Sequence, residues 1–478
     1  MFPLPLTLHS IRGRPLDLLR RPGLEPALAV MEEMRRRGGR PLLVGGFVRD
    51  LLLTGEPPRG DLDVEVQGLS APETERIIRE AGGRVQGRSF AVFALAGVEF
   101  ALPRRERPTG PGHRDFLVEA DPHMPYAEAA ARRDLTMNAM ALDPWEGRLL
   151  DPWGGRIDLA AGILRHTSPR FAEDPLRVLR VMQFAGRFGF APAPGLIALC
   201  RTMSLANLPR ERLWEEWKKL LLQGTRPSLG LRFLRRCGAL SFFPELQALA
   251  DTPQDPEWHP EGTVWDHTLL CLDAAAGLRR GEREPDLLLM LGTLCHDFGK
   301  PATTYRDEER NRIVSPRHEP EGEAPTRTFL ARISGESRLV EQVVPLVRRH
   351  LAPNELYKAH RRGADVRSAI RRLALRTDPL LLEKVARADH LGRHTPDARA
   401  GDFPAGEFFL ARVRELELER SRPAPLVLGR HLLPLGIPPG PAMGRLLDRL
   451  FEAQLDGGFD TTEEGLELLA RWRREEGR

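Results

Sequence analysis

Hydrophobic and polar positions follow two different patterns along the chain. Between Pro41 and about residue 165, short apolar or alternating runs of strand length are separated by turns. A helical spacing of apolar residues precedes this region at Leu24–Arg37, and another interrupts it at Phe47–Leu53. The expected strands are Pro41–Val44, Asp61–Val66, Phe90–Leu95 and Val98–Leu102. This alternation predicts a mixed α/β domain.

From Pro175 onward the spacing of apolar residues is helical almost throughout, most clearly in Leu176–Phe188, Leu213–Leu222 and Leu229–Leu240. Runs rich in Pro and Gly interrupt it and are candidate linkers. These runs are 224–227, 251–260, 402–404 and 421–425. The predicted fold class is therefore an α/β head with a mixed sheet, followed by mostly α-helical domains.

Length and composition restrict the number of domains, the possible partners and the expected cellular compartment. A chain of 478 residues is too long for one compact core, so two to four domains are expected. The net charge of +4 is compatible with nucleic-acid binding, but the many arginines also fit a general compositional bias. The four cysteines form no CxxC pair, which argues against a zinc knuckle or a disulfide framework. We see no secretory leader and no apolar stretch of membrane-spanning length, so we expect a cytoplasmic protein without membrane contact.

The first group of chemically informative residues lies in the head. Gly45 and Gly46 follow a strand and open a helix, whose exposed N–H groups suit a triphosphate. Asp61 and Asp63 are two apart on a strand and so project from the same face. Two such carboxylates suit Mg²⁺, and Glu65 on the same face is a weaker candidate for a third. A DxD or a Gly-Gly pair alone is common by chance, but their order here indicates a nucleotidyltransferase of the polymerase-β type.

Four motifs together resemble the class II tRNA nucleotidyltransferase and poly(A) polymerase family, across about residues 41–222. The first is Val44–Asp50 with Asp61 and Asp63. The second is Arg132–Ala139, and the third is Glu173–Arg180. The fourth is a helix with Glu211, Arg212, Glu216 and Lys219. Gln183 departs from the family pattern, which usually has Arg three residues after Arg180.

The resemblance implies a role for each motif. Asp61 and Asp63 would be catalytic and hold Mg²⁺, while Asp174 and Arg177 would read the base of the incoming nucleotide. Nucleotide binding would also involve Gly45, Gly46, Arg49, Arg132, Arg133, Asp134, Asn138 and Arg180. Simpler interpretations exist for two of these segments. Arg132–Asp134 could be an exposed charged turn, and Glu173–Pro175 is also a good helix start.

The resemblance predicts that CMP and AMP are added to the 3′ end of tRNA, with CTP and ATP as substrates and no template. A loop expected within Ala101–Pro122 has ordinary length, which argues against an enzyme that adds only CC. Addition of A alone, a poly(A) polymerase, and a non-catalytic tRNA-binding protein with a decayed site stay open as alternatives.

A second group of residues resembles an HD-type phosphohydrolase domain. His267, His296, Asp297 and Asp389 match its H…HD…D pattern, which would bind Ni²⁺, Mn²⁺ or Mg²⁺ and support hydrolysis of a phosphoester. His318 and His350 are further candidates for a second metal or for a phosphate, although either could be an ordinary surface histidine.

The expected domain order follows from these assignments. An N-terminal helical extension would span 1–40, the head 41–165, a neck with the templating helix 166–225, the HD domain 226–395 and a tail 396–478. The tail resembles the segment that anchors tRNA in the family, but a small helical packing module is an equal alternative. The sequence leaves the oligomeric state open.

Overall fold

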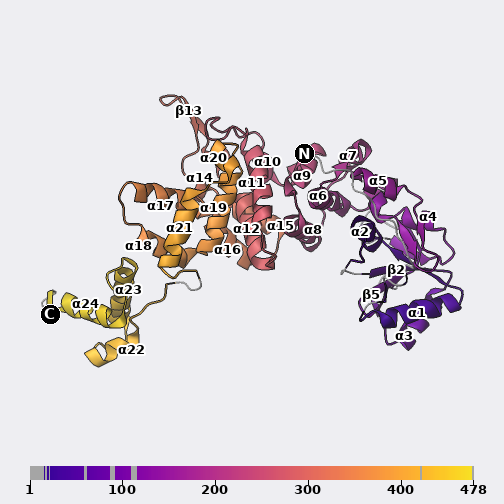
Figure 1. Ribbon diagram of the computed structural model, residues 1–478, viewed down its shortest axis with the longest axis horizontal. Coiled ribbons are helices and arrows are strands. Elements are labelled where there is room, and N and C mark those ends of the chain that lie inside the picture. Colours follow the sequence, from indigo (N-terminus) through magenta and orange to yellow (C-terminus); the bar gives the residue numbers. More distant parts are fainter. Residues whose placement is uncertain are drawn as a thin grey trace. The chain divides into compact units, whose positions relative to one another are not determined.

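A computed structural model describes residues 16, 19–20, 22–58, 62–86, 92–108, 116–419 and 423–475 (Figure 1). The chain forms two compact units. The first comprises Met1–Glu216 and Leu229–Phe242, and the second comprises Trp217–Ser228 and Phe243–Arg478. The domain boundaries expected from the sequence are finer than this division and stay predictions.

The first unit is built on a seven-stranded sheet with the order β3-β4-β5-β2-β1-β8-β9. β2 and β5 are parallel and the other neighbouring strands are antiparallel, so the predicted mixed sheet is confirmed. The strands are β1 (Arg40–Val44), β2 (Leu62–Gln67), β3 (Arg84–Gln86), β4 (Val92–Leu95), β5 (Val98–Ala101), β8 (Ala141–Asp143) and β9 (Arg148–Leu150).

Apolar residues of the central strands fill the core of the head. Leu42, Leu43 and Val44 of β1 are buried, as are Val64 and Val66 of β2. Helices α1 (Glu25–Arg36) and α3 (Ala71–Glu80) pack on each other and on strands of the sheet. A separate hairpin of β6 (Arg104–Pro108) and β7 (Phe116–Ala120) occupies the segment where the sequence predicts a loop; residues 109–115 between them lie outside the described part.

The rest of the first unit is mostly helical, with two short strands, and the helices Arg210–Gln223 and Pro227–Arg236 each extend across the division between the two units. The elements are α2 (Gly46–Thr54), α4 (Tyr126–Ala130), η2 (Thr136–Asn138), α5 (Gly155–Ala161), β10 (Ile163–Leu164), η3 (Pro169–Glu173), α6 (Leu176–Phe188), β11 (Ala191–Pro192), α7 (Pro194–Cys200), α8 (Arg210–Gln223), α9 (Pro227–Arg236) and η4 (Ala239–Phe242). The helix expected over Leu229–Leu240 ends earlier, because Gly238 has a φ of +76°, which ends the α-helix before a 3₁₀ turn.

The second unit contains a bundle in which α11 (Val264–Leu278), α12 (Arg283–Cys295) and α19 (Pro379–Leu391) all pack on one another. Further elements surround it. These are α10 (Pro244–Leu249), α13 (Lys300–Thr303), β12 (Tyr305–Asp307), β13 (Arg312–Val314), α14 (His318–Glu321), α15 (Glu323–Ile333), α16 (Ser337–Arg349), α17 (Ala352–Arg361), α18 (Arg367–Arg376), α20 (Pro396–Ala400) and α21 (Pro404–Glu415).

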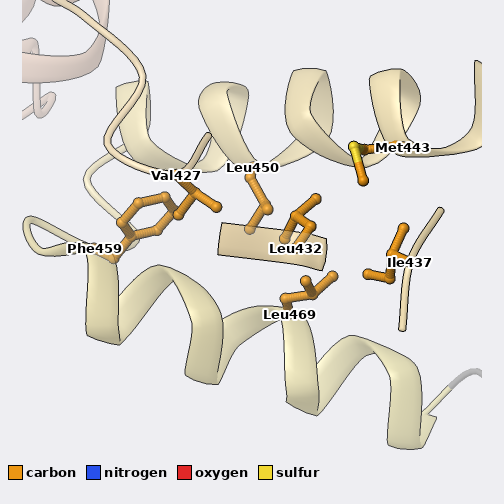
Figure 2. Close-up of a cluster of buried hydrophobic side chains, with 7 residues drawn as sticks. All are labelled: Val427, Leu432, Ile437, Met443, Leu450, Phe459 and Leu469. Carbon is orange, nitrogen blue, oxygen red and sulfur yellow. The ribbon is translucent and has the colours of Figure 1, made fainter. Parts of the chain in front are cut away.

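The C-terminal segment forms a small helical module with its own apolar core. Its elements are α22 (Gly429–Leu432), η5 (Leu433–Leu435), α23 (Pro441–Leu455) and α24 (Thr462–Glu475). Figure 2 shows side chains of the two longer helices meeting those of the preceding segment between them. The cluster consists of Val427, Leu432, Ile437, Met443, Leu450, Phe459 and Leu469. In the part of the chain that the structure describes, no helix combines the length and apolar character needed to cross a membrane.

Candidate functional site

The turn after β1 brings three predicted site residues together. Gly45 has φ +72° and ψ −136°, a backbone conformation that is practically restricted to glycine. A Cβ added there would lie 3.1 Å from Nη1 of Arg133 and 3.4 Å from Oδ2 of Asp63. Asp63 pairs with Val44 on β1, so the strand register places its carboxylate beside the turn. Asp61 lies outside the described residues.

Glu65 follows on the same strand face but is buried, and its Oε1 makes no hydrogen bond within the described residues. Burial raises the pKa of the Glu65 carboxyl, and the positive charges of Arg133, Arg132 and Arg104 oppose that rise. The carboxyl lies close enough to these arginines to feel their charge.

A continuous chain of hydrogen bonds links the head motifs to helix α6. Arg49 donates from Nη1 to Asn138 Oδ1 at 2.7 Å, and Asn138 donates to Asp134 Oδ1 at 2.9 Å. Arg180 of α6 donates from Nε to Asp134 Oδ2 at 2.6 Å. Arg49 also binds Asp50 at 2.7 and 2.9 Å. Four predicted nucleotide-binding residues thus form one buried or half-buried network.

Asp134 is an ionised anchor in this network. Burial opposes its ionisation, but the charge of Arg180 and the hydrogen bonds from Asn138, Arg180 and the Leu135 N–H outweigh burial and lower the pKa of Asp134 to about 2. Both carboxylate oxygens accept hydrogen bonds inside the protein. The exposed charged turn considered from the sequence is therefore wrong for Asp134, which is 7% exposed. A contact of Asp134 with ribose stays a prediction.

Asp174 and Arg177, the predicted base-reading pair, lie at the start of helix α6. Asp174 accepts a hydrogen bond from the Leu176 N–H at 3.1 Å, so the helix-start interpretation holds, and its other oxygen accepts from Arg212 at 2.7 Å. Arg177 donates to the backbone carbonyls of Arg170 at 2.6 Å and Arg132 at 2.5 Å. Arg177 is thereby fixed against the second motif, and the base-reading role of the pair stays a prediction.

The four predicted HD residues converge in the second unit. His267 Nε2 lies 3.0 Å from Asp389 Oδ1, and His296 Nε2 lies 3.2 Å from Asp297 Oδ2. All four side chains are buried. Burial opposes ionisation of both aspartates, but neighbouring positive charges hold the pKa of each well below its usual range. Two imidazoles and two carboxylates therefore share one buried site.

The histidines that the sequence left undecided belong to this site. His318 Nε2 lies 3.5 Å from Asp297 Oδ1 and 3.4 Å from His350 Nε2. Burial, reinforced by His296 and His318, lowers the pKa of His350 to about 3, so its imidazole is neutral at pH 7. One group that could hold a metal ion consists of Asp297, His318 and His350. Another such group consists of His267, Cys271, His296 and Asp389.

Sequence reasoning missed several members of the site. The side chain of Glu261 is 1% exposed, and its Oε1 lies 2.8 Å from His267 Nδ1 and 2.9 Å from His259 Nδ1. Its Oε2 accepts from the His394 N–H at 3.1 Å. Cys271 Sγ lies 3.3 Å from His267 Nε2. The signal for Cys271 was its position one helical turn after His267. His259 falls in the segment 251–260 that looked like a linker, and Glu261 directly follows it.

A cavity of about 320 Å³ is lined in part by residues of this site, namely His259, Asp297, His318, His350 and Asp389. Lys300, Lys358 and Arg393 contribute cationic side chains to its lining, together with the metal-ligand candidates Asp297 and Asp389. Lys300 Nζ lies 2.7 Å from Asp297 Oδ2, and Arg393 donates to Asp389 at 3.1 Å. The cavity is thus suited to an anionic group held against the histidine and aspartate cluster.

The donor set fits a divalent metal. His296 Nε2 and both carboxylate oxygens of Asp297 are buried without a hydrogen bond in the described part of the chain. Asp297 Oδ2 also has the ion pair with Lys300, so the polar atoms that most need a further partner are His296 Nε2 and Asp297 Oδ1. Nitrogen and oxygen donors together suit a transition metal. His296 donates from Nδ1 to the Thr293 carbonyl at 2.7 Å, which leaves the lone pair of Nε2 for a ligand.

The fold and the two sites together define a nucleotidyltransferase joined to an HD-type domain. Three protein families match the chain. They are the Poly A polymerase head domain over residues 42–165, the Probable RNA and SrmB- binding site of polymerase A over 189–249, and the HD domain over 264–393.

Two relatives make the assignment specific. The Multifunctional CCA protein of Xanthomonas campestris pv. campestris (strain B100) is 35% identical over 422 residues, which cover 85% of this chain and 95% of that protein. The Multifunctional CCA protein of Xylella fastidiosa (strain M23) is 39% identical over 328 residues, which cover 66% of this chain and 75% of that protein. The chain belongs to the family of bacterial multifunctional CCA proteins, which are CCA-adding tRNA nucleotidyltransferases with an HD phosphohydrolase domain.

Solved structures share the fold. The CCA-adding enzyme of Bacillus stearothermophilus, in complex with CTP, matches with a TM-score of 0.60 at 22% identity, over 96% of this chain and 99% of the other. The enzyme of Thermotoga maritima, complexed with tRNA, matches with a TM-score of 0.58 at 20% identity, also over 96% and 99%. At these identities the likeness concerns the fold alone.

Proposed function

We propose that the first unit extends tRNA by CMP and AMP from CTP and ATP through the residues around the Gly45 turn. The observation that carries this proposal is the convergence of the Asp63 carboxylate and the Arg133 guanidinium on a turn that opens helix α2. Asp61 and Asp63 would hold Mg²⁺, which would assist the attacking hydroxyl and neutralise the departing pyrophosphate.

Arg133 and the N–H groups at the start of α2 would bind the triphosphate. Asp174 and Arg177 would offer a carboxylate acceptor and a guanidinium donor to the base. Arg177 is supported in this role by its two bonds to backbone carbonyls, because a fixed donor can discriminate between bases. Asp134 of the second motif and Arg180 of the third motif are hydrogen-bonded. This bond would fix the position of the templating helix relative to the bound nucleotide.

The test uses tRNA that ends before CCA, with CTP and ATP supplied separately and together, followed by sequencing of the product. Addition of CCA is expected. Asp63→Ala should reduce addition on the order of a thousandfold, since the metal contributes several kcal/mol to such a transition state. Glu75→Ala, on the exposed side of α3, is the matched control and should retain activity. Homopolymeric A tails on unrelated RNA would instead support a poly(A) polymerase.

We also propose that the HD site hydrolyses phosphoesters with a divalent metal held by His267, His296, Asp297 and Asp389. The observation that carries this is the cluster of buried donors, two of which, Asp297 and Asp389, line a cavity together with Lys300, Lys358 and Arg393. A metal there would supply Lewis acidity at the phosphoester. The oxygens of the phosphoester would be bound by Lys300, Lys358 and Arg393. Water adds to phosphorus, the ester P–O bond breaks, and the alcohol leaves with a proton.

Independence of the two activities tests this assignment. His296→Ala with Asp297→Ala should abolish phosphoester hydrolysis in the presence of Ni²⁺, Mn²⁺ or Mg²⁺. The same variant should add nucleotides to tRNA at the wild-type rate. Loss of both activities would contradict two separate sites, and unchanged hydrolysis would place the phosphohydrolase elsewhere.

A further inference from the structure

The HD site contains a sulfur atom beside its histidine and aspartate donors. Cys271 lies one turn after His267 on α11, and its side chain is fully buried. Its Sγ lies 3.3 Å from His267 Nε2. Each member of this group offers one donor atom, and the donor atoms all lie within 4.8 Å of one another; the members are His267, Cys271, His296 and Asp389. The sulfur is therefore within reach of a metal ion held by the other three residues.

The separation between this sulfur and the histidine nitrogen fits a shared metal ion. A metal about 2.1 Å from a histidine nitrogen and about 2.3 Å from a cysteine sulfur holds the two donors about 3.6 Å apart at a tetrahedral angle and about 3.1 Å apart at a right angle. The 3.3 Å between His267 Nε2 and Cys271 Sγ lies between these values. The two side chains can therefore bind one ion without rearrangement of α11.

The two histidines of this group each keep a nitrogen lone pair for a ligand. Glu261 Oε1 lies 2.8 Å from His267 Nδ1. Because a carboxylate can only accept, Nδ1 carries a proton, and in the neutral ring the lone pair is on Nε2. That atom faces both Cys271 Sγ at 3.3 Å and Asp389 Oδ1 at 3.0 Å. His296 Nε2 is also buried, and it makes no hydrogen bond within the described residues. These nitrogens point to a ligand independently of the cysteine.

The end of helix α19 holds the Cys271 thiol beside these donors. Gly392 directly follows α19, and a Cβ added there would clash with Cys271 Sγ. The sulfur also lies 3.7 Å from the backbone carbonyl of Asp389. The thiol is thus enclosed between its own helix and the helix that supplies Asp389. The packing of α11 on α19 therefore sets the position of the sulfur in the site.

We propose that Cys271 binds the HD metal ion directly, as a thiolate ligand beside His267, His296 and Asp389. This inference rests on the metal site proposed above. The thiol gives up its proton to solvent when the metal–sulfur bond forms. A thiolate is a soft ligand, whereas Mn²⁺ and Mg²⁺ prefer oxygen ligands. Cys271 would therefore raise the affinity of the site for Ni²⁺ more than its affinity for Mn²⁺.

The experiment measures binding of Ni²⁺ and Mn²⁺ to the full-length protein. The wild type with Ni²⁺ should show a sulfur-to-nickel charge-transfer band in the near ultraviolet, and X-ray absorption at the nickel edge should show a sulfur neighbour. Cys271→Ala should lose both signals. It should also bind Ni²⁺ at least about tenfold more weakly, because loss of an outer partner of a ligand already costs about 10- to 100-fold. Its Mn²⁺ affinity should fall less than about threefold, because that ion prefers oxygen.

Two further variants separate coordination from packing. Cys271→Ser keeps nearly the same volume but replaces sulfur by oxygen, so it too should lose the sulfur signals and the preference for Ni²⁺. The matched control is Cys295→Ala. Cys295 is a buried cysteine of the same unit, and among the described residues it belongs to no group that could hold a metal ion. This variant should keep the sulfur signals and the wild-type affinity for Ni²⁺.

Nickel bound by the wild type without a sulfur neighbour would overturn the thiolate ligand and leave the metal site in place. This result needs no variant, so the test does not depend on the folding of the substituted proteins. Sulfur signals that persist in Cys271→Ala, or equal losses of Ni²⁺ and Mn²⁺ affinity in both Cys271 variants, would also overturn it. A wild-type protein whose HD site binds none of Ni²⁺, Mn²⁺ and Mg²⁺ would overturn the metal site as well.

Discussion

Asp134 of the second motif accepts a hydrogen bond from Arg180 of the templating helix at 2.6 Å. The pair joins two motifs that lie 46 positions apart in the sequence. Asn138 and the Leu135 N–H complete the coordination of the same carboxylate. The relative position of the second motif and helix α6 thus depends on one buried anion.

Removal of that anion should destabilise the first unit. Asp134→Asn should lower the free energy of unfolding by about 1.5–3 kcal/mol, the usual contribution of hydrogen bonds to a charged group. Urea unfolding measures this. The control is Asp121→Asn, which removes an exposed partner of Arg105 and should cost less than about 0.5 kcal/mol. An equal effect of both variants would contradict the anchoring role of Asp134.

The same carboxylate predicts a dependence of stability on pH. Its pKa is lowered to about 2 in the folded protein, whereas that of an unfolded Asp is about 3.9. The unfolded state therefore binds protons first, and the stabilisation by Asp134 is present above about pH 4 and is lost as the pH falls toward 2. Unfolding measured across this range should show a weaker acid destabilisation in Asp134→Asn than in the wild type.

Gly45 should be essential for nucleotide addition. Gly45→Ala forces an L-residue into φ +72° and places a methyl group 3.1 Å from the Arg133 guanidinium and 3.4 Å from the Asp63 carboxylate. Gly82→Ala is a close control, because Gly82 has φ +83° in the same unit and its Cβ would meet nothing within 4 Å. Both variants should lose about 1–2 kcal/mol of stability from backbone strain. Only Gly45→Ala should lose nucleotide addition, measured with saturating CTP.

Asp174 should control which nucleotide is added. Asp174→Ala removes a carboxylate acceptor for an exocyclic amine, so discrimination between CTP and UTP should fall by about 5- to 150-fold, the equivalent of about 1–3 kcal/mol for a paired base contact. Ratios of kcat/KM for the two nucleotides measure this. Because Asp174 also binds Arg212, the variant Arg212→Ala separates loss of that contact from loss of base reading. If Arg212→Ala alone relaxed the selectivity as much, the acceptor role would be refuted.

Glu261 should raise the metal affinity of the HD site without touching the ion. It lies 2.8 Å from His267 Nδ1 and so favours the tautomer in which Nε2 carries the lone pair for a metal. Glu261→Gln should weaken binding of Ni²⁺ or Mn²⁺ about 10- to 100-fold, measured by titration calorimetry. The control is Glu257→Gln, whose side chain is 70% exposed and should have no effect.

The sequence by itself determined four of the seven strands of the head sheet, namely β1, β2, β4 and β5, the position of the glycine turn, and the group His267, His296, Asp297 and Asp389, but not β3, β8 or β9. These features are encoded locally, by alternating or helical apolar spacing and by short motifs whose residues lie close together. It could not decide between a surface and a functional role for His318 and His350, because that choice depends on burial.

Only the tertiary structure decided which distant residues meet. Trp258 falls in the segment 251–260 that resembles a linker, and Glu261 directly follows it, yet Trp258 lines the cavity and the side chain of Glu261 is buried against His267. Asp134 likewise looked like part of an exposed turn until Arg180, on a helix far along the chain, was found beside it. Contacts of this kind arise from the packing of whole elements, and no local pattern of residues records them.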